Sequence, residues 1–305
     1  MSGEPRVSVC LATYRRPDRL EALLNDLRCQ TRPPDELVVV DNDAAGSAAQ
    51  VVTRARLAAP YPVIYQIQPE KNISLTRNRT VELASGDWLA FIDDDERAPA
   101  NWLQALLAAC AAHDADGVLA PVVPLVPASA PSWIRRGNFY DWPRTQTGNV
   151  VPANHLRFGN LVLRAALLRT GEPPFDPAYG RTGGEDGDLL VRLARGGARL
   201  IWCDEAPVCE PVDASRLSLR WLLHRSLRGG QDYARHSLRG RYGHAGHAAR
   251  LQLLLRSFGQ AAAALLLALL TLPFGTHRCA HWLMKASANL GKLSAFLGWH
   301  YHEYA

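Results

Sequence analysis

The stretch SLTRNRTVELASGDWLAFIDDDE, residues 74–96, decides the fold of this chain. Its first half has the spacing of a helix and closes at Gly86, a residue type that commonly ends helices. Its second half is an apolar run that predicts a buried strand over residues 87–95. That strand ends in three adjacent aspartates, and Glu96 follows them. Four neighbouring carboxylates repel one another, which raises the question of what neutralises them.

The same alternation of helix and strand extends to both sides of this stretch. Strands are expected over residues 6–14, 35–43, 62–68, 87–95 and 117–126, and helices over residues 15–30, 47–58, 74–86 and 99–113. Short links between alternating strands and helices predict an α/β fold with a mainly parallel, Rossmann-like sheet flanked by helices on both faces.

Polar residues follow three of the expected strands. They are Thr13 and Tyr14 after the first strand, residues 41–43 after the second and residues 93–95 after the fourth. Ligands of such sheets bind beyond the carboxyl ends of the strands, where the chain order switches. These three groups are therefore expected to face one crevice.

The chain is less regular after residue 126. Residues 127–152 are rich in Pro, Gly, Asn and Trp and are expected to form an irregular region beside the crevice. Order resumes at residues 159–168. Residues 183–197 then predict a glycine loop followed by a helix with Glu185 and Asp186 at its start, where the helix dipole favours acids and simple capping would also explain them. Residues 198–210 predict a final pair of strands.

The acidic run has two readings on composition alone. One is a solvated turn. The other is a divalent cation, magnesium or manganese, held by hard carboxylate oxygens, with substrate phosphates completing its shell. Alternate residues of an extended segment point the same way, so Asp93 and Asp95 would face one site.

Four stretches together resemble the family 2 glycosyltransferases, which have the GT-A fold. They are VSVCLATYRRPDRL at residues 7–20, LVVVDND at 37–43, the stretch at 74–96, and GGEDGDLLVRL at 183–193. The resemblance spans roughly residues 7–210, and the order and spacing of the pieces make it specific. It implies a catalytic domain over residues 1–214, with a nucleotide-binding half to about residue 125 and an acceptor-binding half over 126–214.

The resemblance implies a role for each matching residue around the nucleotide. Ala12 and Tyr14 border the base, and Asp41 accepts a hydrogen bond from a ring nitrogen of the base, which favours uracil. Arg77 and Asn78 lie near the ribose and the diphosphate.

The family's DxD motif falls on residues 93–95. The resemblance implies that Asp93 contacts the ribose or the metal, that Asp95 binds the metal, and that Mn²⁺ or Mg²⁺ is the cofactor. Asp94 is placed with the substrate-binding residues, although Glu96 is a fourth acid and the sequence leaves open which of the two helps.

The Glu-Asp pair supplies the implied catalytic base. Asp186 matches the base of an inverting transferase, and Glu185 is a hydrogen-bonding neighbour of the donor or acceptor. Gly183 and Gly184 permit a mobile loop over the substrate. Asn160 either lines the donor-sugar pocket or is a turn asparagine, and both readings stay open.

Processive relatives carry a QxxRW-type motif after the Glu-Asp pair. Arg220 and Trp221 match its last two letters, but Leu217 stands where glutamine is needed. The partial match favours transfer of one sugar to a glycan or lipid-linked acceptor over synthesis of long chains.

Net charge divides the chain at residue 214. The whole chain carries +5, but residues 215–305 hold ten Arg and two Lys against Asp232 and Glu303. A basic tail suits nucleic acid or an anionic membrane surface. Because this charge adjoins an apolar helix and not a face of stacking aromatics, we expect a membrane and no nucleic acid.

The tail contains twenty residues without a charge, 257–276, which is long enough for a membrane helix or a buried core helix. Arg256 precedes it, and Arg278 and Lys285 follow it, so both flanks are basic. A hairpin or a helix pair lying in the cytosolic leaflet fits this better than a single crossing. We expect residues 215–305 to be a helical, membrane-associating tail that holds the enzyme at the cytoplasmic face of the inner membrane, as a peripheral or monotopic protein.

Other functions would require different sequence motifs. A nucleotidyltransferase would carry a Gly-rich phosphate loop after the first strand, and residues 11–19 contain no glycine. A protein that only binds sugar nucleotides would lack the base, whereas Asp186 is present. Six cysteines without a CxxC pair fit a reducing compartment and not a zinc site.

Overall fold

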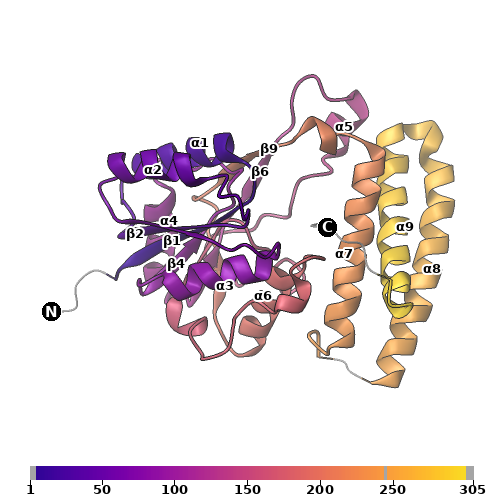
Figure 1. Cartoon of the computed structure of the whole chain (residues 1–305). Helices are drawn as coiled ribbons and strands as arrows, with labels where there is room; N and C mark the ends of the chain where they lie inside the picture. Colours follow the sequence, from indigo (N-terminus) through magenta and orange to yellow (C-terminus); the bar gives the residue numbers. More distant parts are fainter. Residues whose placement is uncertain (1–4, 244–245, 300–305) are drawn as a thin grey trace. The chain divides into compact units, whose positions relative to one another are not determined.

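The computed structural model describes residues 5–243 and 246–299 (Figure 1). The chain divides into two compact units. The first unit comprises Met1–Val123 and Trp142–Glu210, and the second comprises Pro124–Asp141 and Pro211–Glu303. The sequence placed a boundary at residue 214 but gave no sign that residues 124–141 belong with the tail.

A seven-stranded sheet forms the centre of the first unit, in the order β3-β2-β1-β4-β7-β5-β8. The strands are β1 (Val7–Thr13), β2 (Glu36–Asp41), β3 (Val63–Ile67), β4 (Trp88–Phe91), β5 (Gly117–Leu119), β7 (Leu161–Arg164) and β8 (Leu200–Trp202). All neighbours are parallel except β7, which runs antiparallel to both β4 and β5. The predicted mainly parallel α/β sheet is confirmed.

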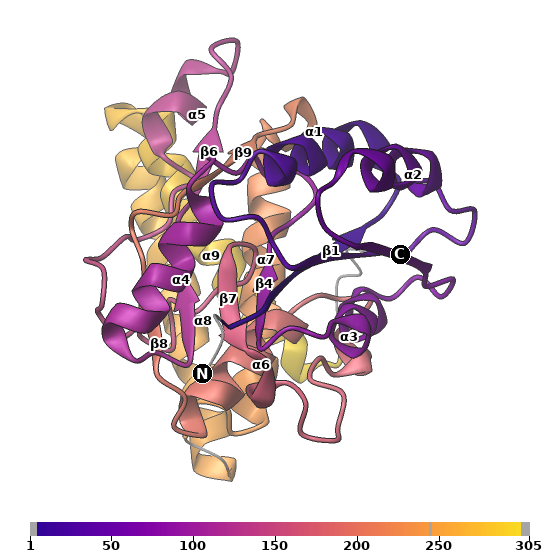
Figure 2. The same cartoon turned by 90° about the vertical axis from the view of Figure 1, so that its left-hand side faces the viewer.

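Helices cover both faces of this sheet (Figures 1 and 2). One face packs against α1 (Pro17–Arg28), α2 (Ala49–Ala58) and α4 (Trp102–His113), and the other against α3 (Ile73–Leu83) and α6 (Glu185–Arg195). The central strand β1 supplies both cores in alternation, because successive side chains of a strand point to opposite faces.

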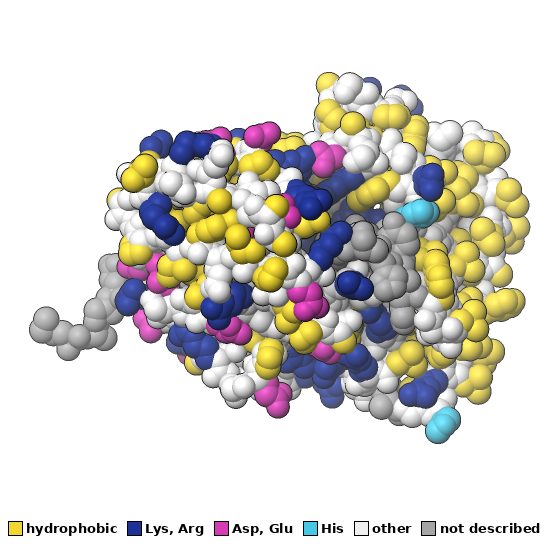
Figure 3. Space-filling model, viewed as in Figure 1, with side chains coloured by type: hydrophobic (Ala, Val, Ile, Leu, Met, Phe, Trp, Pro, Cys, Tyr) yellow, Lys and Arg dark blue, Asp and Glu magenta, His cyan; other side chains and the backbone are white. Residues whose placement is uncertain are grey.

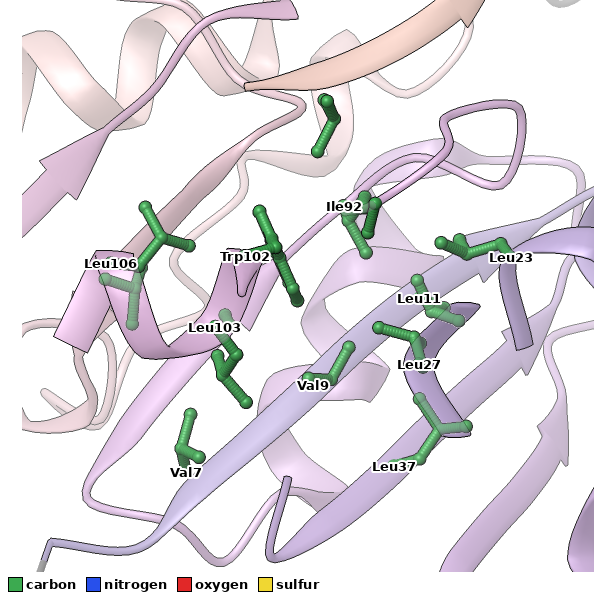
Figure 4. Close-up of a cluster of buried hydrophobic side chains, with 14 of the residues drawn as sticks. Val7, Val9, Leu11, Leu23, Leu27, Leu37, Ile92, Trp102, Leu103 and Leu106 are labelled. Carbon is green, nitrogen blue, oxygen red and sulfur yellow. The ribbon is translucent and has the colours of Figure 1, made fainter. Parts of the chain in front are cut away.

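The alternation of β1 is visible in the two cores. Val7, Val9 and Leu11 lie in the first core with Leu23 and Leu27 of α1, as Figure 4 shows, whereas Cys10 lies in the second. A strand buried on both faces is expected to be mostly apolar, and β1 is so except for Ser8 and Thr13, whose hydroxyls donate to Glu36 and Asp94.

The predicted strand over residues 117–126 is wrong, since the structure has two strands there. β5 stays in the main sheet, while β6 (Val122–Leu125) pairs with β9 (Val208–Pro211) in a separate two-stranded sheet. Pro121 lies between them and has no N–H to donate to a ladder. Its carbonyl instead accepts a hydrogen bond from the backbone N–H of Val208 at 2.9 Å, which directs the chain away from β5.

The sheet brings the ends of several strands to one edge. Thr13 at the end of β1 is in register with Asp41 at the end of β2, and Phe91 at the end of β4 is in register with Leu161 at the start of β7. Because β7 is antiparallel, the residues that precede it reach the same edge as the acidic run. The expected convergence of strand ends is therefore present.

The second unit is helical. It contains α5 (Ser132–Gly137), α7 (Leu219–Leu238), α8 (His247–Thr271) and α9 (Thr276–Phe296), and α9 packs against both α7 and α8. Short 3₁₀ turns complete the chain: Ala165–Leu167, Pro177–Tyr179, Ala214–Arg216 and Leu272–Phe274. Residues 127–152 are irregular as predicted, apart from α5 and the bridge at Val150.

Glycines let α7 and α9 approach closely. A Cβ on Gly230 would lie 1.9 Å from the carbonyl oxygen of Ala288, and one on Gly291 would lie 2.0 Å from that of Leu227. Ser287 of α9 adds a hydrogen bond of 2.7 Å to the carbonyl of Leu223. Small residues and hydroxyl-to-backbone bonds of this kind are common where helices pack inside membranes.

Candidate active site

The acidic run forms a turn and not an extended segment. β4 ends at Phe91, and the backbone N–H of Glu96 donates to the carbonyl of Asp93 at 3.1 Å. The strand predicted over residues 87–95 is therefore shorter than expected, and the alternation argument for Asp93 and Asp95 does not apply. The Asp93 side chain is 46% exposed, whereas that of Asp95 is 7% exposed, so the two carboxylates have different surroundings.

Arginines from the segment after β1 neutralise part of this turn. Arg16 donates to Asp94 at 3.2 Å and to Asp95 at 2.9 Å, and Arg19 donates to Asp95 at 3.3 Å. Thr13 adds a hydroxyl hydrogen bond of 2.7 Å to Asp94. The repulsion that the sequence raised is therefore offset by cations of the chain itself, supplied by the neighbouring strand end.

Arg77 neutralises a further part of the negative charge, that of Asp93 and Glu185. This buried side chain of α3 lies 2.5 Å from Glu185 and 3.3 Å from Asp93, so one guanidinium joins α3, the acidic turn and α6. The ring of Phe158 lies 4.4 Å from the guanidinium and covers it. The structure brings Arg77, Asp93 and Glu185 together, as the sequence predicted for residues of one site.

Two acids of the turn have raised pKa values. Burial raises the pKa of the Asp94 carboxyl to about 6, since Arg16 and Thr13 only partly counteract it. Burial also raises the pKa of Glu96 well above its ordinary value, and repulsion by Asp93 acts in the same direction. Burial is the largest cause for both groups, so the protonated form of each carboxyl is favoured more than it is in water.

Glu185 and Asp186 begin α6, as predicted. The preceding residues Gly183 and Gly184 have φ of +79° and +95°, backbone angles that residues with a side chain rarely adopt. Glu185 turns inward to Arg77, while Asp186 remains partly exposed and its carboxylate accepts from the N–H of Gly187 at 2.7 Å. The charge of Asp186 acts on Asp93, so the two carboxylates lie in one site.

The loop after β2 uses Asp41 internally. Its carboxylate is fully buried and accepts hydrogen bonds from the N–H groups of Asp43 and Ala48, at 2.9 and 2.8 Å, and from the hydroxyl of Tyr65 at 3.0 Å. These bonds shape the loop. Recognition of a base by Asp41 stays a prediction, and Asp43, which pairs with the exposed Arg15 at 3.2 Å, lies beside it.

Ala12 and Tyr14 are partly exposed at the end of β1, where the sequence placed the base. The ring of Tyr14 lies 5.1 Å from the guanidinium of Arg15 and 5.2 Å from the ammonium of Lys71. A flat, cation-lined aromatic ring at a strand end is suited to stacking.

Asn78 and Asn160 are bound within the fold. Asn78 exchanges two hydrogen bonds, of 2.7 and 2.9 Å, with the backbone of Phe175. Asn160 accepts from the indole N–H of Trp102 at 2.8 Å and donates to the carbonyls of Pro121 and Ala206 at 2.9 and 2.8 Å. Their contacts support the structural reading of Asn160, and their roles toward a substrate stay predictions.

Two charged residues of this site were missed by the sequence analysis. Glu210 acts on the charges of Asp93 and Glu96, and Arg157 lies close enough to both to be affected by them. Arg157 belongs to the segment that enters β7, where antiparallel pairing returns the chain to the edge of the sheet. The letters LRFGN, residues 156–160, carry no signal of this role, because only the antiparallel pairing of β7 brings Arg157 to the site.

The carboxylates of the acidic turn are suited to a divalent cation, which would also bind a phosphate group. Among the residues that the structure describes, no three His, Cys, Asp or Glu side chains form a metal site by themselves. Gly159 nevertheless leaves space against two of them, since a Cβ there would lie 3.1 Å from Oε1 of Glu96 and 3.5 Å from Oδ2 of Asp93. Hard carboxylate oxygens around such a space suit Mg²⁺ or Mn²⁺, which usually take further ligands from phosphate.

Known proteins agree with this architecture. Residues 8–160, half of the chain, match the glycosyl transferase family 2 domain. The chain is 35% identical to the succinoglycan biosynthesis protein ExoM of Rhizobium meliloti over 75% of this chain and 74% of that protein. It is 29% identical to the galactofuranosyltransferase GlfT1 of Mycobacterium tuberculosis over 67% of this chain and 70% of that protein.

The fold has solved counterparts. The mannosyltransferase PcManGT of Pyrobaculum calidifontis, solved with GDP-Man and Mn²⁺, superposes with a TM-score of 0.67, at 20% identity over 97% of this chain and 88% of that chain. Residues 1–349 of Staphylococcus aureus TarS, solved with UDP, superpose with a TM-score of 0.55 at 18% identity over 97% and 93% of the two chains. The chain belongs to glycosyl transferase family 2 and has the GT-A fold.

Proposed function

We propose that this glycosyltransferase moves a single sugar, with inversion, from a UDP-linked donor to a glycan or lipid-linked acceptor. One observation carries the proposal: Arg77 pairs both with Asp93 of the acidic turn and with Glu185, the residue before Asp186 at the start of α6. A base and a diphosphate-binding group in one site are what an in-line displacement requires. The names of ExoM, a succinoglycan biosynthesis protein, and of GlfT1, a galactofuranosyltransferase, support a role in polysaccharide synthesis.

A divalent cation bound by Asp93 and Asp95 would neutralise the diphosphate as it leaves. Asp186 would take the proton from the attacking acceptor hydroxyl, a contribution typically of about 10²–10⁴-fold in rate. Its partial exposure is consistent with this task, because a general base must reach the acceptor. Glu185 is held by Arg77 and so stays oriented toward the substrate side of α6.

The nucleotide would lie across the strand ends. Tyr14 and Ala12 would border the base, with Asp41 behind them, and Arg77 and Asn78 would lie toward the ribose and diphosphate. Asp94, which is tied to Thr13 and Arg16, would fix the turn against the ribose.

The test is a donor screen with UDP-, GDP- and dTDP-sugars, with and without Mn²⁺ or Mg²⁺, that measures release of the nucleotide. We expect metal-dependent turnover of a UDP-sugar, and Asp186→Asn should abolish it while leaving nucleotide affinity near wild type. Turnover of a GDP- or dTDP-sugar instead would show that the donor is not UDP-linked. A loss of affinity in Asp186→Asn would show that Asp186 holds the ligand and is not the base.

The second unit would place the enzyme on the cytoplasmic face of the membrane. His247–Phe274 is, within the described residues, a helical segment long and apolar enough to cross a bilayer, and most of its apolar part is not buried. Its packing is inverted relative to a soluble helix. The buried side of α8 consists of small residues, namely Ser257, Ala261, Ala264 and Ala268.

The outer side of α8 carries the large apolar residues. Leu255, Phe258, Leu266, Leu269 and Leu270 are all at least 57% exposed, and Figure 3 shows hydrophobic side chains gathered over α8 and α9. Small residues inside and large ones outside match a lipid environment. The exposed Arg250 and Arg256 in the first half of α8, and Arg278 near the start of α9, suit anionic headgroups.

Co-flotation with liposomes tests this placement. We expect the chain to float with anionic vesicles, and a Leu266→Ser, Leu269→Ser, Leu270→Ser variant to stay in the soluble fraction with nucleotide binding unchanged. Equal flotation of both proteins would refute the lipid-facing role of α8. A dimer that persists without lipid and dissociates in the variant would instead identify this face as an interface between copies.

A further inference from the structure

Arg157 is a charged side chain without a direct partner in the candidate active site. Its Nη1 is buried and has no hydrogen-bond partner, and no carboxylate of the described residues forms an ion pair with it. Arg77, in the same site, pairs with both Glu185 and Asp93. An unpaired buried charge is costly, so a fold keeps one only where something else compensates it.

The position of Arg157 is fixed from two sides. Its guanidinium lies 4.7 Å from the centre of the Trp142 ring. The loop that follows Trp142 is anchored by Arg144, which forms a two-pronged ion pair with Asp204 at 2.8 and 2.8 Å. On the other side, Asn160 makes its three hydrogen bonds within the fold. The guanidinium is therefore held against the ring of Trp142, and the chain near both residues is anchored.

Carboxylates of the site act on this guanidinium without forming an ion pair with it. Burial lowers the pKa of Arg157, and the charges of Glu96, Glu210, Asp93 and Asp186 act in the opposite direction. A cation that faces four carboxylates, yet pairs with none, leaves its N–H donors for a group that enters between them. That group must carry oxygen atoms and negative charge, since a guanidinium matches oxyanions and an apolar group would leave the charge uncompensated.

We propose that Arg157 and Trp142 form an oxyanion-binding subsite of the active site, which takes either a phosphate oxygen of the donor diphosphate or a carboxylate on an acidic sugar. The subsite rests on the proposed glycosyl transfer. Trp142 holds the guanidinium plane through a cation–π contact, and Arg157 donates to the oxyanion. Both sources share one chemistry, and the ligands of the experiment separate them.

A merely structural Arg157 makes a different prediction. If the side chain served only to offset the negative charge of Glu96 and Glu210, its replacement would lower stability and alter the binding of every nucleotide by a similar factor. An oxyanion subsite instead discriminates between ligands that have the oxyanion and ligands that lack it.

The experiment compares Arg157→Gln and Arg157→Lys with wild type by calorimetric titration in the presence of Mn²⁺. Arg164→Gln is the matched control, because Arg164 also lies 4.7 Å from a tryptophan ring, that of Trp88, but is 44% exposed and pairs with Asp116. The ligands are UMP, UDP, UDP-glucose and UDP-glucuronate, with GMP and GDP in parallel.

A phosphate subsite requires that Arg157→Gln weaken binding of the diphosphates and of both UDP-sugars about 10- to 100-fold, with the monophosphates unchanged and partial rescue by Arg157→Lys. A carboxylate subsite requires that only UDP-glucuronate be weakened. The proposal is overturned if no ligand is affected, or if all are weakened equally together with a lower melting temperature. If wild type binds none of these nucleotides, the proposed function itself fails; if wild type binds and Arg157→Gln binds equally well, the subsite alone fails.

Discussion

Replacing Asn160 separates a structural from a catalytic role for a residue at the heart of the site. Asn160→Ala removes one acceptor and two donor contacts, those with Trp102, Pro121 and Ala206. All of these bonds are buried, and the side chain is 2% exposed. Alanine therefore leaves the indole N–H of Trp102 and the carbonyl of Ala206 without partners in a place that water does not reach, whereas the carbonyl of Pro121 keeps its hydrogen bond from the N–H of Val208.

The magnitude follows from the cost of such orphaned groups. Each buried polar group left unsatisfied costs about 1–3 kcal/mol. Two of them, with some relaxation of the surrounding chain, predict a loss of about 2–5 kcal/mol in the free energy of unfolding of the first unit. At about 2–4 °C per kcal/mol for a unit of this size, the melting temperature should fall by roughly 10 °C.

Urea unfolding followed by tryptophan fluorescence measures this loss, and nucleotide titration at low temperature measures binding by the protein that remains folded. Asn149→Ala is the matched control, since its amide makes one exposed hydrogen bond of 2.9 Å to Thr145, and its loss should be below about 0.5 kcal/mol. If Asn160→Ala unfolded like wild type but lost donor-sugar turnover, the structural account would be wrong and the donor-pocket reading would stand.

Three further perturbations test other parts of the chain. Glu36→Gln should lower the free energy of unfolding at pH 7 but not below about pH 4. Burial alone would raise the pKa of Glu36, but the hydrogen bonds from Ser8 and Ser85 lower it overall, so the stabilisation is present above the pKa of the unfolded chain and is lost as pH falls. Equal stability of both proteins at every pH would contradict this. Gly291→Val should lower the free energy of unfolding by at least about 2 kcal/mol, because it forces α9 away from Leu227. Gly259→Ala on α8, where a Cβ meets nothing within 4 Å, should instead raise it by about 0.5–1 kcal/mol in thermal unfolding. A change of the same sign in both variants would refute the close approach of α7 and α9. Arg16→Ala should weaken diphosphate binding in calorimetry, because Asp94 and Asp95 lose the cation they share; unchanged affinity would mean that Arg19 and Thr13 hold the turn alone.

The acidic turn illustrates how far its sequence could be interpreted. The position of the carboxylates at a strand end was visible, and so was the convergence of that end with Thr13. Their partners were not visible, because Arg16, Arg19 and Arg77 lie on segments whose distance along the chain says nothing about contact. The turn itself was misjudged as extended, since the hydrogen bond from Glu96 to Asp93 depends on where the sheet ends.

The same limit applies to the segment before β7. Its residues belong to the site only because β7 runs antiparallel to β4, which returns Arg157 and Gly159 to the edge where the parallel strands end. Strand direction is a tertiary property, since a short apolar strand has the same pattern in either direction. The sequence therefore could not place Arg157 beside Glu96 and Asp186.

By itself, the sequence determined the α/β class, the family and the order of the elements. Those depend on local periodicity and on motifs that stand contiguously in the chain, such as the alternating apolar runs and the acids after β4. Only the tertiary structure decided which charges neutralise one another and that α8 packs through its small residues. It also showed that the side chains of Asp41, Asn78 and Asn160 form hydrogen bonds within the fold. Each of those outcomes is a contact between distant segments, and contact energies are fixed by distance in space, which spacing along a chain does not encode.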